Sequence, residues 1–162
     1  MNSPLAARHA ERAAADAEML DRIEALQPLG EDYSRRLVDI IDPRNGAIDV
    51  YPAKTKESGA FSASVYGIRP FIKMNFQDSY DDVSTLAHEL GHALHSSLSM
   101  GSQPYLTSRY VPFLAEIAST CNEVLLSRHM VANASSDAER AWLLSELVET
   151  IRGTIYRQTL FA

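Results

Sequence analysis

The sequence predicts a mainly α-helical fold with a small antiparallel β-hairpin. Apolar residues recur with helical spacing over most of the 162 residues, whereas strict alternation is confined to a short stretch at 61–66. The composition, 46% hydrophobic and 22% charged residues, is that of an ordinary globular domain. We therefore expect a single domain with three parts: a helical lead-in over 1–45, a small β region over 46–78 and a group of helices over 79–162.

The lead-in and the start of the β region are predicted to contain two helices and a short strand. Residues 6–26 have apolar side chains at helical spacing, and Pro28 and Gly30 are expected to end this helix. A second short helix is expected over 31–41. After a turn, residues 48–51 are expected to form a short strand.

The β-hairpin is predicted from two β-like runs joined by a short connection. Residues 61–66 alternate with period two, and residues 71–76 form the second run. Gly67 and Pro70 lie in the connection, where both residue types favour a turn. The two runs are therefore expected to pair as antiparallel neighbours.

Three further helices are predicted, over residues 79–99, 112–130 and 136–162. Ser79 and Asp82 resemble a capping box at the start of the first, and Gly101 and Pro104 are expected to end it. Pro112 suits the first turn of the second helix. No helix-ending residue follows the last apolar positions of the third, so we expect it to run to the end of the chain.

Composition excludes several classes of partner. The formal charge of −6 and the isoelectric point near 5.3 argue against a nucleic-acid partner. No stretch approaches the ~20 consecutive apolar residues of a membrane span, and the first residues lack the apolar core of a signal peptide. Cys121 is the only cysteine, so no internal disulfide can form, and a reducing cytoplasm is the expected location.

Residues 88–92 read His-Glu-Leu-Gly-His, which is a zinc-binding pattern when it lies on a helix. Positions i and i+4 share one helix face and differ by about 6 Å in rise, so His88 and His92 can bind one Zn²⁺. Glu89, about 100° further round, can then act as the base toward a zinc-bound water. The pattern also occurs by chance in surface helices, so the surrounding residues decide between the two interpretations.

The rest of this helix supports a metal site. Four apolar residues lie on the face opposite the histidines: Val83, Leu86, Leu90 and Leu94. Gly91 lies near the ligand side, where the missing side chain lets substrate or backbone come close. One face is therefore expected to pack into a core while the other presents metal ligands.

A catalytic zinc usually keeps three protein ligands and one open position. Glu116, 28 residues after His88 on the next helix, is the preferred third ligand. Glu123 falls on the same face about two turns further on, as an alternative ligand or as a hydrogen-bond partner of a zinc-bound histidine. His95 lies about 10.5 Å along the helix from His88, so it is expected to line the cleft or support the ligands. The simpler alternative is that both glutamates face solvent.

Several motifs in the same order extend this pattern. Residues 85–96 read Thr-Leu-Ala-His-Glu-Leu-Gly-His-Ala-Leu-His-Ser, and further matching segments lie at 58–61, 65–67, 103–105, 113–120 and 151–159. Together they resemble the active-site region of the oligoendopeptidase F family, in the thimet oligopeptidase group of zinc peptidases, over roughly residues 28–162. The resemblance implies a zincin-like catalytic core in which two helices carry the zinc ligands His88, His92 and Glu116, with Glu89 as the catalytic base.

The same resemblance implies a cytoplasmic endopeptidase that hydrolyses short peptides with one Zn²⁺ per chain. It implies that the hairpin at 58–76 borders the cleft and pairs with substrate like an added strand. The candidate substrate-binding residues are Tyr66, Gly67, Tyr105 and Tyr110. The three tyrosines and His95 are also the candidates for stabilising the oxyanion, although a packing role suits each of them equally well.

Members of this family are several times longer than this chain, and residues that steady the transition state lie in their later part. We therefore expect a catalytic-core fragment or a naturally shortened relative. The alternative function is a zinc-binding but inactive fragment, acting through homo-oligomerisation or together with the missing segments as a complementing chain. Zinc content and turnover of an oligopeptide substrate distinguish these interpretations from each other and from an accidental motif.

Overall fold

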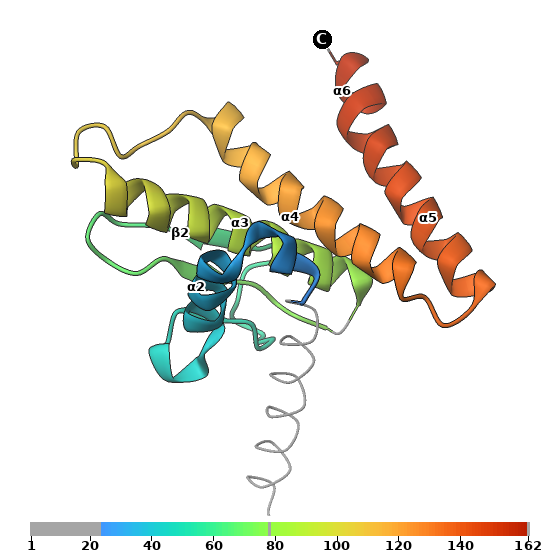
Figure 1. The fold of residues 1–162 in the computed structure, drawn as a ribbon, viewed down its shortest axis with the longest axis horizontal. Helices are drawn as coiled ribbons and strands as arrows, with labels where there is room; N and C mark the ends of the chain where they lie inside the picture. The colour runs from blue at the N-terminus through green and yellow to red at the C-terminus, as the bar shows by residue number, and fades with distance from the viewer. Residues whose placement is uncertain (1–23, 78, 162) are drawn as a thin grey trace, which may run out of the picture.

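The computed structural model describes residues 24–77 and 79–161 (Figure 1). In chain order, its elements are the 3₁₀ helix η1 (Glu24–Leu29), α2 (Glu31–Ile41), the 3₁₀ helix η2 (Pro43–Asn45), β1 (Ile48–Asp49), β2 (Phe61–Ala63), β3 (Phe71–Lys73), α3 (Tyr80–Ser102), α4 (Pro112–Ala132), α5 (Asp137–Ile151), the π helix η3 (Arg152–Tyr156) and α6 (Arg157–Thr159). The predicted mainly helical fold with a small β region is confirmed. Of the helix predicted over 6–26, residues 6–23 lie outside the described residues.

The sheet has three short strands in the order β1–β3–β2. β2 and β3 pair antiparallel, with Phe61 opposite Lys73, so the predicted hairpin is present in a shorter form. β1 extends it by pairing parallel to β3, with Ile48 opposite Ile72. β2 is therefore an edge strand, and its Phe61 side chain is 49% exposed while Ser62 is partly buried. Among the described residues, the outer edge of β2 has no strand partner.

α3 begins where predicted and ends later. The capping box is complete, because the Asp82 N–H donates to Ser79 Oγ at 3.1 Å and the Ser79 N–H donates to Asp82 Oδ2 at 3.1 Å. The helix continues through Gly101 to Ser102, so the expected end near residue 99 is wrong. Gln103 has φ −115° and ψ 146°, the extended conformation that a following Pro104 favours. The proline, and not the glycine, ends this helix.

The last helical segment is not one continuous α-helix. The π helix η3 separates α5 from α6, but the three segments are contiguous, so the last helix predicted from residue 136 is confirmed as far as Thr159. The interruption contains Gly153, Thr154 and Ile155, a glycine and two β-branched residues of low helix propensity. Leu143 is the buried apolar residue of α5, and this segment lies away from the α3 core (Figure 1).

The main core lies where α2, the sheet and the inner face of α3 meet. Its buried members include Leu37, Ile40, Ile72, Met74, Leu86, Leu90 and Leu94. All four apolar residues predicted to lie opposite the histidines, Val83 among them, are buried, so the two-faced character of this helix is confirmed. No helix among the described residues combines the length and apolarity needed to cross a bilayer.

A hydrogen-bonded chain joins three helices beneath the histidine face. Asn122 of α4 is fully buried, and its Nδ2 donates to the carbonyl oxygen of Ala87 in α3 at 3.0 Å. The hydroxyl of Tyr33 in α2 donates to Asn122 Oδ1 at 2.8 Å. Burial raises the pKa of Tyr33 to about 12, although the hydrogen bond to Asn122 opposes this shift.

Tyr33 is expected to make folding sensitive to alkaline pH. In the unfolded chain a tyrosine ionises near pH 10, whereas Tyr33 in the folded chain keeps its proton to about pH 12. Its contribution to the free energy of unfolding is therefore complete below pH 10 and is lost as the pH rises toward 12. Urea unfolding between pH 8 and 12 should show this fall, and Tyr33→Phe should flatten it. Tyr156→Phe, at an exposed tyrosine, is the control, and equal slopes for all three proteins would contradict the assignment.

Candidate metal centre

Three side chains from two helices bring their donor atoms together. His88 Nε2 and His92 Nε2, on α3, lie 3.0 Å apart. Glu116 Oε2, on α4, lies 3.4 Å from the first nitrogen and 3.6 Å from the second. Ligand atoms about 2.1 Å from one tetrahedral zinc lie about 3.4 Å from each other, so this donor triangle has the size of a zinc site. Two imidazole nitrogens and a carboxylate oxygen are also donors that zinc accepts.

Gly91 determines how closely α3 and α4 approach. A Cβ atom at this position would lie 2.7 Å from Ser119 Cα and 2.8 Å from the carbonyl oxygen of Ala118, both in the backbone of α4. Only glycine permits this contact, which lets Glu116 reach across to the histidines. The expected role of this position, close approach by another backbone, is therefore confirmed for the backbone of α4.

Both acidic residues of α4 contact the histidines, but at different atoms. Glu116 Oε2 lies near both Nε2 atoms and accepts a 2.9 Å hydrogen bond from Ser119 Oγ, which fixes its carboxylate. Glu123 Oε1 lies 3.4 Å from the opposite nitrogen of the ring, His88 Nδ1. The hydrogen bond to Glu123 raises the pKa of His88, and burial opposes it. A carboxylate at Nδ1 orients the ring so that Nε2 faces the donor triangle.

Glu89 lies next to the donor triangle in a protected position. Its side chain is buried, with 7% of its surface exposed, and burial raises the pKa of its carboxyl group. The charges of His88 and His92 and a hydrogen bond from the backbone N–H of Ser62 lower the same pKa. Because Ser62 belongs to β2, this contact brings the edge strand next to the carboxylate.

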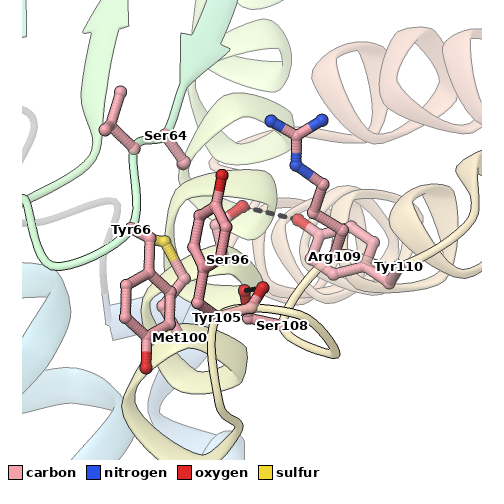
Figure 2. A pocket seen from close by; sticks show the side chains of 9 residues that line it. Ser64, Tyr66, Ser96, Met100, Tyr105, Ser108, Arg109 and Tyr110 are labelled. Carbon is pink, nitrogen blue, oxygen red and sulfur yellow. Dashed lines mark hydrogen bonds between the residues drawn. The ribbon is translucent and has the colours of Figure 1, made fainter.

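The remaining predicted site residues divide into two places. His95 stacks on Tyr110 with the ring centroids 3.9 Å apart, and it lies outside the donor triangle. Tyr66 and Tyr105 contact each other edge to face at 5.4 Å. All three tyrosines line one pocket of about 560 Å³ (Figure 2). Gly67, with φ 77°, instead lines a separate pocket of about 320 Å³ beside α2.

Sequence reasoning did not single out three residues that contact the metal site or line the tyrosine pocket. Ser119 follows Glu116 by three residues on the same helix, and this spacing was a usable signal. Ser62 is recognisable only once β2 is docked against α3. Arg109 lines the tyrosine pocket from an irregular segment between two helices, where no periodic pattern marks it.

A histidine pair one helical turn apart, a neighbouring glutamate and a carboxylate from a second helix define the kind of site that zinc hydrolases use. The sequence model of the protein family named peptidase family M3 matches residues 9–162, and the chain belongs to this family. This confirms the resemblance seen in the sequence motifs.

Similar proteins and a solved structure agree with this membership. The chain is 40% identical over 140 residues to the oligopeptidase PepF of Bacillus subtilis, covering 86% of this chain and 21% of that protein. It is 42% identical over 139 residues to the group B oligopeptidase PepB of Streptococcus agalactiae, covering 86% and 23%. A crystal structure from Chlamydophila abortus, of a protein provisionally assigned as a peptidase, superposes with a TM-score of 0.84 at 39% identity. That match covers 90% of this chain and 24% of the other. The chain thus spans less than a quarter of each of these relatives.

Proposed function

We propose that this chain carries the catalytic site of a zinc-dependent endopeptidase that hydrolyses short peptides. The observation that carries the proposal is the donor triangle of His88, His92 and Glu116, with the buried Glu89 directly beside it. The oligopeptidase names of the relatives support a peptide substrate. In this proposal the core is zincin-like, α3 and α4 are the two ligand-bearing helices, and residues 1–162 act as one catalytic-core domain located in the cytoplasm.

The proposed chemistry divides between the metal and the chain. A zinc ion held by the three ligands supplies Lewis acidity, which polarises the scissile carbonyl and acidifies water. The Glu89 carboxylate accepts the proton of the attacking water and then transfers it to the departing amine. Glu123 holds the His88 ring in place, and Ser119 holds the Glu116 carboxylate, through the contacts described above.

The edge strand β2 offers a place for the peptide. Its outer edge is free of strand partners among the described residues, and Ser62 contacts Glu89. A peptide that adds to this edge as a further strand would have its backbone beside the general base. Tyr66 follows this strand in the chain, and Tyr105, from the segment after α3, contacts it edge to face. Both tyrosines are proposed to contact the substrate.

The alternative is a zinc-binding chain without turnover that acts with a second copy or a complementing chain. Exposed apolar side chains on the last helices, such as Val148, Ile155 and Leu160, are consistent with a covered surface in a larger assembly. The alternative is less well supported, because the similar proteins are named as peptidases.

Zinc content and peptide hydrolysis test this proposal together. We expect the wild-type chain to bind one zinc ion, measured by mass spectrometry, and to cleave an internally quenched peptide. His88→Ala should lose both properties because it removes a ligand, whereas His129→Ala, near the end of α4, should keep both. Full zinc occupancy in His88→Ala would contradict the ligand assignment. Zinc-loaded wild type without turnover would favour the inactive alternative.

A further inference from the structure

The tyrosine pocket lies one helical turn from the proposed zinc site. Ser96, in its wall, follows His92 by four residues on α3, so the two share a helix face and differ by about 6 Å in rise. An extended peptide advances about 3.3 Å per residue. When the scissile bond of a peptide lies at the donor triangle, a substrate group roughly two residues away therefore reaches this pocket.

Among its described lining residues, the pocket wall combines one cation with several hydroxyl groups and contains no acidic side chain. Its polar members are Ser64, Tyr66, Ser96, Tyr105, Ser108, Arg109 and Tyr110. Figure 2 shows the guanidinium of Arg109 and the hydroxyl of Tyr105 directed to the same side of the pocket. Among the residues that the structure describes, no carboxylate pairs with Arg109. An unpaired guanidinium beside hydroxyl donors suits a carboxylate, which it can bind through two parallel hydrogen bonds.

The segment that carries Arg109 is fixed on α3, so the backbone from which this side chain extends is held in a defined position. On one side, Ser99 Oγ donates to the carbonyl oxygen of Ser108 at 2.7 Å. On the other side, the Tyr110 hydroxyl lies 2.6 Å from Ser96 Oγ while its ring stacks on His95. Both chain neighbours of Arg109 are thus tied to the helix that carries the two histidines. Such anchoring limits the entropy lost when the side chain binds a ligand.

We propose that Arg109 binds a carboxylate of the peptide substrate, about two residues from the cleaved bond. This inference rests on the proposed peptidase function. It makes Arg109 a specificity-determining residue, because a neutral group in the same pocket would leave the guanidinium without its partner. The carboxylate can belong to an acidic side chain or to the C-terminus of a short peptide, and these two sources share the same chemistry.

The test compares matched peptides with the zinc-loaded wild type, Arg109→Gln and the control Arg140→Gln, which changes an exposed arginine of α5. One peptide series exchanges Glu for Gln at each position, and a second exchanges a free C-terminus for an amide. We expect the wild type to prefer the carboxylate at one position by about 10–100-fold in kcat/KM, since a hydrogen bond to a charged group has that effect. Arg109→Gln should abolish the preference, because it should lower kcat/KM for the carboxylate peptide far more than for its neutral counterpart. The series that shows the preference identifies the source of the carboxylate.

Equal loss for charged and neutral peptides, or an unchanged preference in Arg109→Gln, would overturn the proposal. If the wild type hydrolyses none of the peptides, the peptidase proposal fails separately. In that case, fluorescence anisotropy of labelled peptides decides the role of Arg109. The proposed role of Arg109 is supported if the carboxylate peptide binds more tightly than its neutral counterpart and only Arg109→Gln loses this difference. Equal binding of the two peptides by the wild type would reject the role.

Discussion

Replacing Glu89 by glutamine should lower kcat for peptide hydrolysis by about 10²–10⁴-fold while the chain keeps one zinc ion, because general-base catalysis contributes a factor of this size. The glutamine has the same shape, so it should occupy the same buried position beside His88 and Ser62. It cannot accept the proton of the attacking water. The measurement is turnover of an internally quenched peptide, with zinc content and thermal unfolding recorded on the same samples.

Glu123→Gln is the matched control for this experiment, since it makes the same chemical change at another carboxylate within contact of His88. Because Glu123 contacts His88 Nδ1, its loss should weaken zinc affinity by about 10–100-fold. Turnover of the fully zinc-loaded Glu123→Gln protein should fall far less than that of Glu89→Gln. Full activity in Glu89→Gln would show that another group is the base. Loss of zinc in Glu89→Gln would instead indicate that Glu89 is itself a zinc ligand.

The histidine face was predictable from the sequence because its geometry is local. Four residues along a helix return to the same side, so His88 and His92 had to lie together once this segment was helical. The apolar residues opposite them were predictable for the same reason, and the core packs against that face. The capping box at Ser79 likewise depends on only four consecutive residues, and it fixes where α3 starts.

The relation between the two glutamates was not predictable in the same way. Glu116 and Glu123 share one face of α4, and helical periodicity does not say which of them faces which nitrogen. That depends on how α4 docks on α3, which is decided by contacts such as Gly91 against Ser119. In the folded chain Glu116 lies at the Nε2 atoms and Glu123 at Nδ1.

Other features depend on pairings between distant parts of the chain. β1 joins β3 across more than twenty residues, and the two-residue strand has no strong pattern of its own. Arg109 lines the pocket because Ser99, Ser96 and His95 hold its neighbours against α3. Such contacts are long-range in sequence or lie in irregular segments, where periodicity carries no information.

Gly91→Ala is expected to damage the zinc site without touching any of its ligands. The new methyl group would lie within 2.9 Å of three backbone atoms of α4, and a backbone cannot swing aside as a flexible side chain can. The helices must therefore separate, which we expect to lower the free energy of unfolding by about 1–3 kcal/mol or more. The same separation draws Glu116 away from His88 and His92. Zinc affinity, measured by competition with a chelator, should fall at least as far as for Glu123→Gln.

Gly101→Ala on the same helix separates this steric effect from the general effect of the substitution. A methyl group there meets no atom within 4 Å, and the position is helical. Alanine should therefore stabilise the chain by about 0.5–1 kcal/mol, because it restricts the unfolded state, and zinc affinity should stay unchanged. Equal stability and zinc affinity in the two variants would mean that α3 and α4 do not require their close contact. If stability and zinc affinity fall only in Gly91→Ala, the metal site requires the absence of a side chain at position 91 as much as it requires its ligands.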